Sequence, residues 1–202
     1  MRWLTGLLLA LLSHHSLAGN QAYEPLSASV RAALHAAVSD LAAPYLAFDT
    51  VEEARAWLDA MAKKLERRIP DRVAREEFLV TVHYEARRAG LDPQMVLGLI
   101  QIESNFRKHA VSSAGARGYM QVMPFWVRLI GTREQNLFHL RTNLRYGCTI
   151  LRHYLDREHG DYFRALGRYN GSLGQRDYPD MVVRASINTW KYPLRLAGAP
   201  VR

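Results

Sequence analysis

Glu103 is the residue of this sequence that is best placed for acid–base chemistry. Val96, Leu99 and Ile100 precede it by three to seven positions, so helical spacing puts these apolar side chains on the face that carries its carboxyl group. Partial burial and the negative end of a helix dipole both favour a protonated carboxyl group. We therefore expect an acid able to protonate a leaving oxygen near neutral pH. The alternative is an ordinary glutamate at a helix end that reaches water.

The elements that position Glu103 are predicted to be mainly helices. Asp92 and Pro93 open its own helix as an N-cap and a proline at the first helical position. Thr50 followed by Glu53 is a capping box that starts an earlier helix. Residues 110–124 break the helical pattern with turn residues and predict an irregular loop or a small β-excursion. The predicted class is mainly α with a minor β element, and helical periodicity marks the segments 30–41, 51–65, 79–89, 93–102, 143–155, 161–168 and 177–190.

Four short motifs follow one another from about residue 75 to about residue 185. In chain order they are Glu103-Ser104 with Gly115-Ala116-Arg117-Gly118-Tyr119-Met120-Gln121, Asn143-Leu144 with Gly147 and Leu151, Arg168-Tyr169-Asn170-Gly171, and Tyr178 with Val182. This series resembles the catalytic domain of soluble lytic transglycosylases. The chain departs from the family pattern at Tyr119, where Leu is usual, and at Arg168, where Ala is usual.

The resemblance implies a lysozyme-like α+β fold that acts on peptidoglycan glycan strands. It implies that Glu103 is the catalytic acid and base, and that the strand is cut with formation of a 1,6-anhydro ring on the muramic sugar. No cofactor or metal is implied, and the histidines show no metal-ligand spacing. The residues with an implied role in binding substrate are Ser112, Gln121, Met123, Tyr169, Asn170 and Tyr178.

A second carboxylate is missing close to Glu103, because residues 104–127 contain no Asp or Glu. Hydrolytic glycosidases usually place two carboxylates beside the bond that breaks. A single carboxyl group favours the transglycosylase route, in which it protonates the leaving oxygen and then deprotonates a hydroxyl group of the substrate. A lysozyme-type hydrolase with a distant Asp, and a non-catalytic wall-binding adaptor of a secretion apparatus, are the alternatives.

The first 18 residues predict export. Arg2 precedes an uncharged apolar run, Leu4–Leu12, and the small residues Ser16 and Ala18 follow. This pattern is typical of a cleaved secretory signal peptide, and the run is short for a membrane span. A tethering helix is the alternative. The sequence therefore predicts a periplasmic protein with no integral membrane span in its mature chain.

The remaining chain divides at Pro70. Residues 19–70 are predicted to be a helical extension, 71–190 a lytic transglycosylase-like catalytic domain, and 191–202 a C-terminal tail. The formal charge of +8 suits a polyanionic partner. Scattered arginines and export argue against nucleic acid, so peptidoglycan is the expected partner, with a cell-envelope machine as a further candidate.

Overall fold

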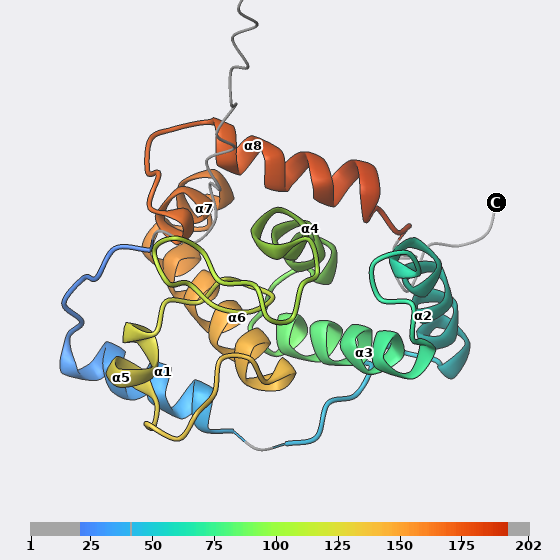
Figure 1. Cartoon of the computed structure of the whole chain (residues 1–202), viewed down its shortest axis with the longest axis horizontal. Helices are drawn as coiled ribbons and strands as arrows, with labels where there is room; N and C mark the ends of the chain where they lie inside the picture. Colours follow the sequence, from blue (N-terminus) through green and yellow to red (C-terminus); the bar gives the residue numbers. More distant parts are fainter. Residues whose placement is uncertain (1–20, 41, 194–202) are drawn as a thin grey trace, which may run out of the picture.

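The computed structural model describes residues 21–40 and 42–193, which form helices joined by loops (Figure 1). The predicted signal peptide, 1–18, lies outside the described residues. Within them, no helix has the length and apolar character needed to cross a membrane. The helices are α1 (Ala28–Ser39), α2 (Val51–Leu65), α3 (Arg72–Arg88), α4 (Pro93–Ser104), α5 (Phe125–Ile130), α6 (Leu140–Arg157), α7 (Tyr162–Asn170), α8 (Asp177–Arg184) and the π-helical turn η1 (Ala185–Thr189).

Helix α4 lies at the centre of the fold, with α3, α8 and η1 packed against it (Figure 1). Nine of its twelve residues are buried, which agrees with a helix that is apolar nearly all round. Gly98 lets η1 approach closely, because a Cβ atom at this position would lie only 2.8 Å from the backbone nitrogen of Ser186. The helix that ends at Glu103 is thus held on several sides.

Short polar side chains start the helices where the sequence predicts them. The Thr50 hydroxyl accepts a hydrogen bond from the Glu53 N–H at 3.1 Å, and the Asp92 carboxylate accepts one from the Gln94 N–H at 2.8 Å. These bonds satisfy N–H groups that have no partner inside the first turn of a helix. Gly90, with φ of +65°, follows the end of α3 as predicted.

A buried ion cluster joins α3 to α6. The fully buried carboxylate of Glu85 accepts a hydrogen bond from the Arg145 guanidinium at 2.8 Å and another from Arg88 at 3.0 Å. Arg141 lies 3.8 Å from the same carboxylate. A buried charge is tolerated only when it is paired and hydrogen-bonded, so this cluster fixes how the two helices sit together.

The predicted mainly α class is confirmed. The β-structure of the described residues is limited to two isolated bridges, Val111 with Arg117 and Arg117 with Val122, both in the loop predicted over 110–124. The sequence analysis missed α5, because its six residues are too few to show a helical period.

The predicted extension packs against the rest of the fold. Helix α1 contacts α5 and α6, and α2 contacts α3. Trp57, Met61 and Leu65 of α2 are buried in the same core as the residues that follow. The soft boundary at Pro70 and the tail at 191–202 stay predictions, and 194–202 lie outside the described residues.

One contact between the extension and α3 is an aromatic cluster around His83. The imidazole ring stacks on Phe48 with ring centres 4.6 Å apart, and its centre lies 4.9 Å from that of Trp57. Burial, with a smaller effect from the charge of Arg87, lowers the pKa of His83 from 6.5 to about 4. His83 is therefore neutral in the folded protein near neutral pH.

We expect His83→Phe to remove part of the protein's sensitivity to acid. Between pH 6.5 and 4 an unfolded chain protonates this histidine while the folded chain does not, so the free energy of unfolding falls as the pH falls through this window. Phenylalanine keeps the ring stacking and has no proton to bind. Thermal melts at pH 7 and pH 5 test this: wild type should lose more thermal stability than the variant. Equal losses in both proteins would contradict it.

Candidate active site

Glu103 lies in the last turn of α4 and is 3% exposed. The helix ends just after it, because Asn105 and Phe106 both adopt left-handed backbone conformations, with φ of +47° and +64°. Asn105 is held there by a hydrogen bond of 2.8 Å from Arg68 to its side-chain oxygen. The predicted burial of the Glu103 carboxyl group is confirmed.

The carboxyl group of Glu103 accepts a hydrogen bond at Oε1 from the hydroxyl of Tyr178 on α8. Burial raises the pKa of Tyr178 well above its ordinary value, and the nearby charge of Glu103 raises it further. Tyr178 therefore keeps its proton and acts as a donor. This contact orients the carboxyl group and stabilises its ionised form.

The loop 110–124 is attached to the end of α4 by Ser104, the residue that follows Glu103 in the sequence. The Ser104 hydroxyl donates to the backbone oxygen of Tyr119 at 2.7 Å. Asn143 on α6 accepts from the Met120 N–H at 2.8 Å and donates to the Arg117 oxygen at 2.8 Å. These fully or nearly fully buried side chains replace the partners that a regular strand would give the loop.

Two glycines of the predicted motifs make this arrangement sterically possible. Gly118 has φ of +75°, and a Cβ atom there would lie 2.4 Å from the Asn143 amide nitrogen. At Gly147 on α6, a Cβ atom would lie 2.3 Å from the sulfur of Met120. Both contacts are far shorter than van der Waals separation, so any larger residue would displace the loop.

The predicted binding residues of the loop take different positions. Ser112 is half-buried, and its hydroxyl accepts a hydrogen bond of 3.1 Å from the Ala116 N–H. Gln121 is buried with φ of +48°, and its amide donates to the oxygens of Ala110 and Gly118 at 3.1 and 2.9 Å. Met123 is partly buried against the core. Ser112 and Gln121 thus shape the loop, and the roles of all three in binding substrate stay predictions.

The predicted binding residues of α7 are also buried. The Tyr169 hydroxyl donates to the Met120 oxygen at 2.8 Å, so it ties α7 to the loop. Burial raises the pKa of Tyr169 well above its ordinary value, with a further rise from the charge of Glu103. Asn170 is 5% exposed, and its side-chain oxygen has no hydrogen-bond partner among the described residues. An acceptor in this state suits a substrate hydroxyl or a water molecule.

The sequence analysis missed Gln21, which contacts the same loop from the N-terminal segment. Its side-chain oxygen accepts hydrogen bonds from the Met123 N–H at 3.3 Å and the Trp126 indole N–H at 3.1 Å. Its amide donates to the Gln121 oxygen at 3.4 Å. No sequence signal marks a pairing between residues about one hundred positions apart.

Glu24 anchors this N-terminal segment to α7. Its carboxylate pairs with Arg168 at 3.1 Å and also with Arg157. Arg168 also pairs with Glu158. The departure from the family pattern at Arg168 thus coincides with an ion pair to a segment outside the motifs.

The described residues contain no group of three or more His, Cys, Asp or Glu side chains arranged to hold a metal ion. Residues 81–180 match the family described as "Transglycosylase SLT domain". The chain therefore contains a transglycosylase SLT domain. Glu103, Ser104 and Tyr178 all lie within it, whereas Gln21 and Glu24 lie outside it.

Known relatives agree with this assignment. The chain is 32% identical over 111 residues to the "Transglycosylase" of Enterobacteria phage PRD1, which covers 52% of this chain and 41% of that protein. It is 42% identical over 52 residues to "Membrane-bound lytic murein transglycosylase C" of Mannheimia succiniciproducens, and the match covers 26% of this chain and 15% of that protein. It is 33% identical over 118 residues to the protein of that name in Histophilus somni, and this match covers 50% of this chain and 32% of that protein. The chain thus spans less than half the length of these relatives.

A solved structure is also similar to this chain. An inactive mutant of the lytic transglycosylase Slt from Pseudomonas aeruginosa aligns with a TM-score of 0.44 and 24% identity, over 60% of this chain and 22% of that one.

We expect Gln21→Ala to destabilise the SLT domain by about 1–3 kcal/mol, because it leaves the partly buried Met123 N–H and the buried Trp126 indole N–H without their acceptor. Urea unfolding measures the change, and hydrogen exchange at the Met123 amide should become faster. Gln175→Ala, which alters an exposed side chain, is the control. Equal stability of the Gln21 and Gln175 variants would show that the N-terminal contact contributes nothing.

Proposed function

We propose that this protein is a lytic transglycosylase that cuts the β-1,4 bond between N-acetylmuramic acid and N-acetylglucosamine in peptidoglycan. The observation that carries the proposal is the buried Glu103 carboxyl group, oriented by the protonated Tyr178 hydroxyl within an SLT domain. The names of the relatives support the same substrate, since murein is peptidoglycan.

The proposed reaction uses Glu103 twice. Its carboxyl group first donates a proton to the glycosidic oxygen while the bond from C1 of the muramic sugar breaks. The resulting carboxylate, stabilised by the hydrogen bond from Tyr178, then removes the proton of the C6 hydroxyl. The C6 oxygen attacks C1 and closes a 1,6-anhydro ring. The proton returns to Glu103, so no water is consumed and the acid is regenerated.

The proposed compartment is the periplasm, where this substrate lies. The motif of residues 1–18 supports export. Association with a cell-envelope machine stays a prediction.

We expect the purified protein to release 1,6-anhydro muropeptides from bacterial sacculi, because residues 104–127 supply no second carboxylate to activate water. Mass spectrometry of the soluble products tests this. Products with only reducing ends would support the lysozyme-type hydrolase instead. No soluble product from the folded protein would support the wall-binding adaptor.

Glu103→Gln is the decisive variant for this reaction. It keeps the size of the side chain and should lower the rate at least about 100-fold, since a positioned acid–base group typically contributes 10²–10⁴ in rate. Glu52→Gln, on an exposed position of α2, is the matched control. Near-normal turnover by a folded Glu103→Gln protein would refute the role of Glu103.

We expect Tyr178→Phe to lower the rate about 10- to 100-fold while Glu103 still acts, because one hydrogen bond to a charged group is worth about 1.5–3 kcal/mol. The loss should be larger in kcat than in KM, since the bond stabilises the carboxylate formed during the reaction. The double variant with Glu103→Gln should be no slower than Glu103→Gln alone. Independent, multiplying losses would argue that Tyr178 acts elsewhere.

A further inference from the structure

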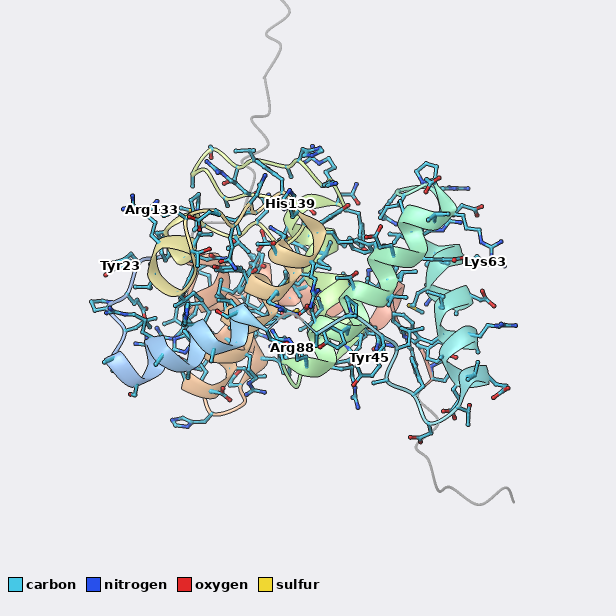
Figure 2. All side chains as sticks on the ribbon, turned by 90° about the horizontal axis from the view of Figure 1, so that it is seen from below. Tyr23, Tyr45, Lys63, Arg88, Arg133 and His139 are labelled. Carbon is cyan, nitrogen blue, oxygen red and sulfur yellow. The ribbon has the colours of Figure 1, made fainter. Side chains whose placement is uncertain are left out.

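A concave site lies beside the loop that follows Glu103. It is a cavity of about 470 Å³ between α5 and the segment 131–138. Three arginines line it, Arg117, Arg128 and Arg133, together with one acidic residue, Glu134. We call it the arginine pocket. Figure 2 shows Arg133 beside α5, at the opposite end of the molecule from Lys63 on α2.

The three arginines share the absence of a carboxylate partner in the described part of the chain. Among residues 21–40 and 42–193, no carboxylate forms an ion pair with Arg117, Arg128 or Arg133. By contrast, Arg145 and Arg168 pair with Glu85 and Glu158. The side chains of Arg117, Arg128 and Arg133 are exposed, so their guanidinium groups are available to an anion.

Apolar side chains form part of the lining of the arginine pocket. Leu137 and Val127 are buried beneath it. The guanidinium of Arg117 lies over the ring of Phe138, 5.8 Å from its centre, which restrains the arginine side chain. Guanidinium groups bind carboxylates through paired, charge-assisted hydrogen bonds. The pocket therefore suits a ligand with several carboxylates and a short apolar part.

The backbone connects this pocket to the loop beside Glu103. Arg117 forms a β-bridge with Val122, with backbone hydrogen bonds of 3.0 Å in both directions. Asn143, which holds the Met120 N–H, also holds the Arg117 carbonyl oxygen. Pro124, directly after Met123, lines the pocket. The pocket and the end of α4 therefore contact the same loop.

We propose that the arginine pocket binds the carboxylates of the peptide stem attached to the glycan strand. This proposal rests on the proposed function and adds a requirement to it: the strand is recognised through its peptide as well as its sugars. A stem peptide with free glutamate and diaminopimelate carboxylates binds, and amidation of those carboxylates weakens binding.

A membrane surface fits the same pocket less well. Anionic lipid surfaces are bound by basic side chains accompanied by apolar side chains that insert between headgroups. None of the large apolar side chains exposed in the described part of the chain lines this pocket. Its concave shape also favours a ligand that enters it.

Binding of a synthetic peptide tests the proposal without any turnover. The probe is fluorescently labelled L-Ala-γ-D-Glu-meso-diaminopimelate, compared with its amidated form by fluorescence anisotropy. Wild type should bind the acid form more tightly. The combined variant Arg117→Gln, Arg128→Gln and Arg133→Gln should lose about tenfold in affinity, since each exposed ion pair by itself is weak and three are removed together. The amidated peptide should show little difference between wild type and variant.

Two further variants separate this site from general charge and from misfolding. Arg55→Gln, Lys63→Gln and Arg67→Gln together remove three exposed positive charges at or near α2, and should leave peptide affinity unchanged. Glu134→Gln removes the negative charge from the lining of the pocket, which should raise affinity two- to threefold because a nearby exposed charge has a modest effect on an anionic ligand. A damaged fold cannot produce that gain.

The outcomes distinguish the two proposals. Equal peptide affinity of wild type and the pocket variant, or equal losses in the pocket and α2 variants, would overturn the arginine pocket. Loss of binding to phosphatidylglycerol vesicles by the pocket variant, without any peptide binding by wild type, would assign the pocket to a membrane instead. Absence of 1,6-anhydro products from wild type would refute the proposed function, while specific peptide binding would still support the pocket.

Discussion

The structure depends on satisfying the backbone of an irregular, partly buried loop. Residues 110–124 form turns and only two isolated bridges, so their backbone hydrogen bonds to one another leave some N–H and carbonyl groups to be paired by other segments. Buried backbone groups without partners are costly. Side chains supply those partners here: Asn143 from α6, Ser104 from α4, Tyr169 from α7 and Gln121 from the loop itself.

This constraint couples architecture to the site. Glu103 and Ser104 are neighbours at the end of α4, and one presents the carboxyl group while the other fastens the loop. Tyr178 reaches Glu103 only because α8 packs tightly on α4, which requires Gly98. A change that loosens the loop or separates these helices would therefore move the Glu103 carboxyl group relative to a substrate bound beside the loop. Stability and chemistry share the same few contacts.

Charge is distributed in two distinct ways over this basic chain. Some arginines are structural, since Glu85 holds Arg145 in the interior and Glu24 connects Arg168 to the N-terminal segment. The arginines of the arginine pocket form no ion pair with a carboxylate of the described residues. They line one concave, partly apolar surface. Net charge alone indicates a polyanionic partner, whereas this arrangement indicates where such a partner would bind.

The sequence by itself determined the helical class, the helix starts at Thr50 and Asp92, and the burial of Glu103, because caps and apolar periodicity are local signals. It identified Tyr178 through a motif and placed Gln121 in the loop. Only the tertiary structure showed that Gln121 braces the loop and that Tyr178 donates to Glu103. It also revealed Gln21, about one hundred residues from its partners, because hydrogen bonds between distant segments leave no pattern in one sequence.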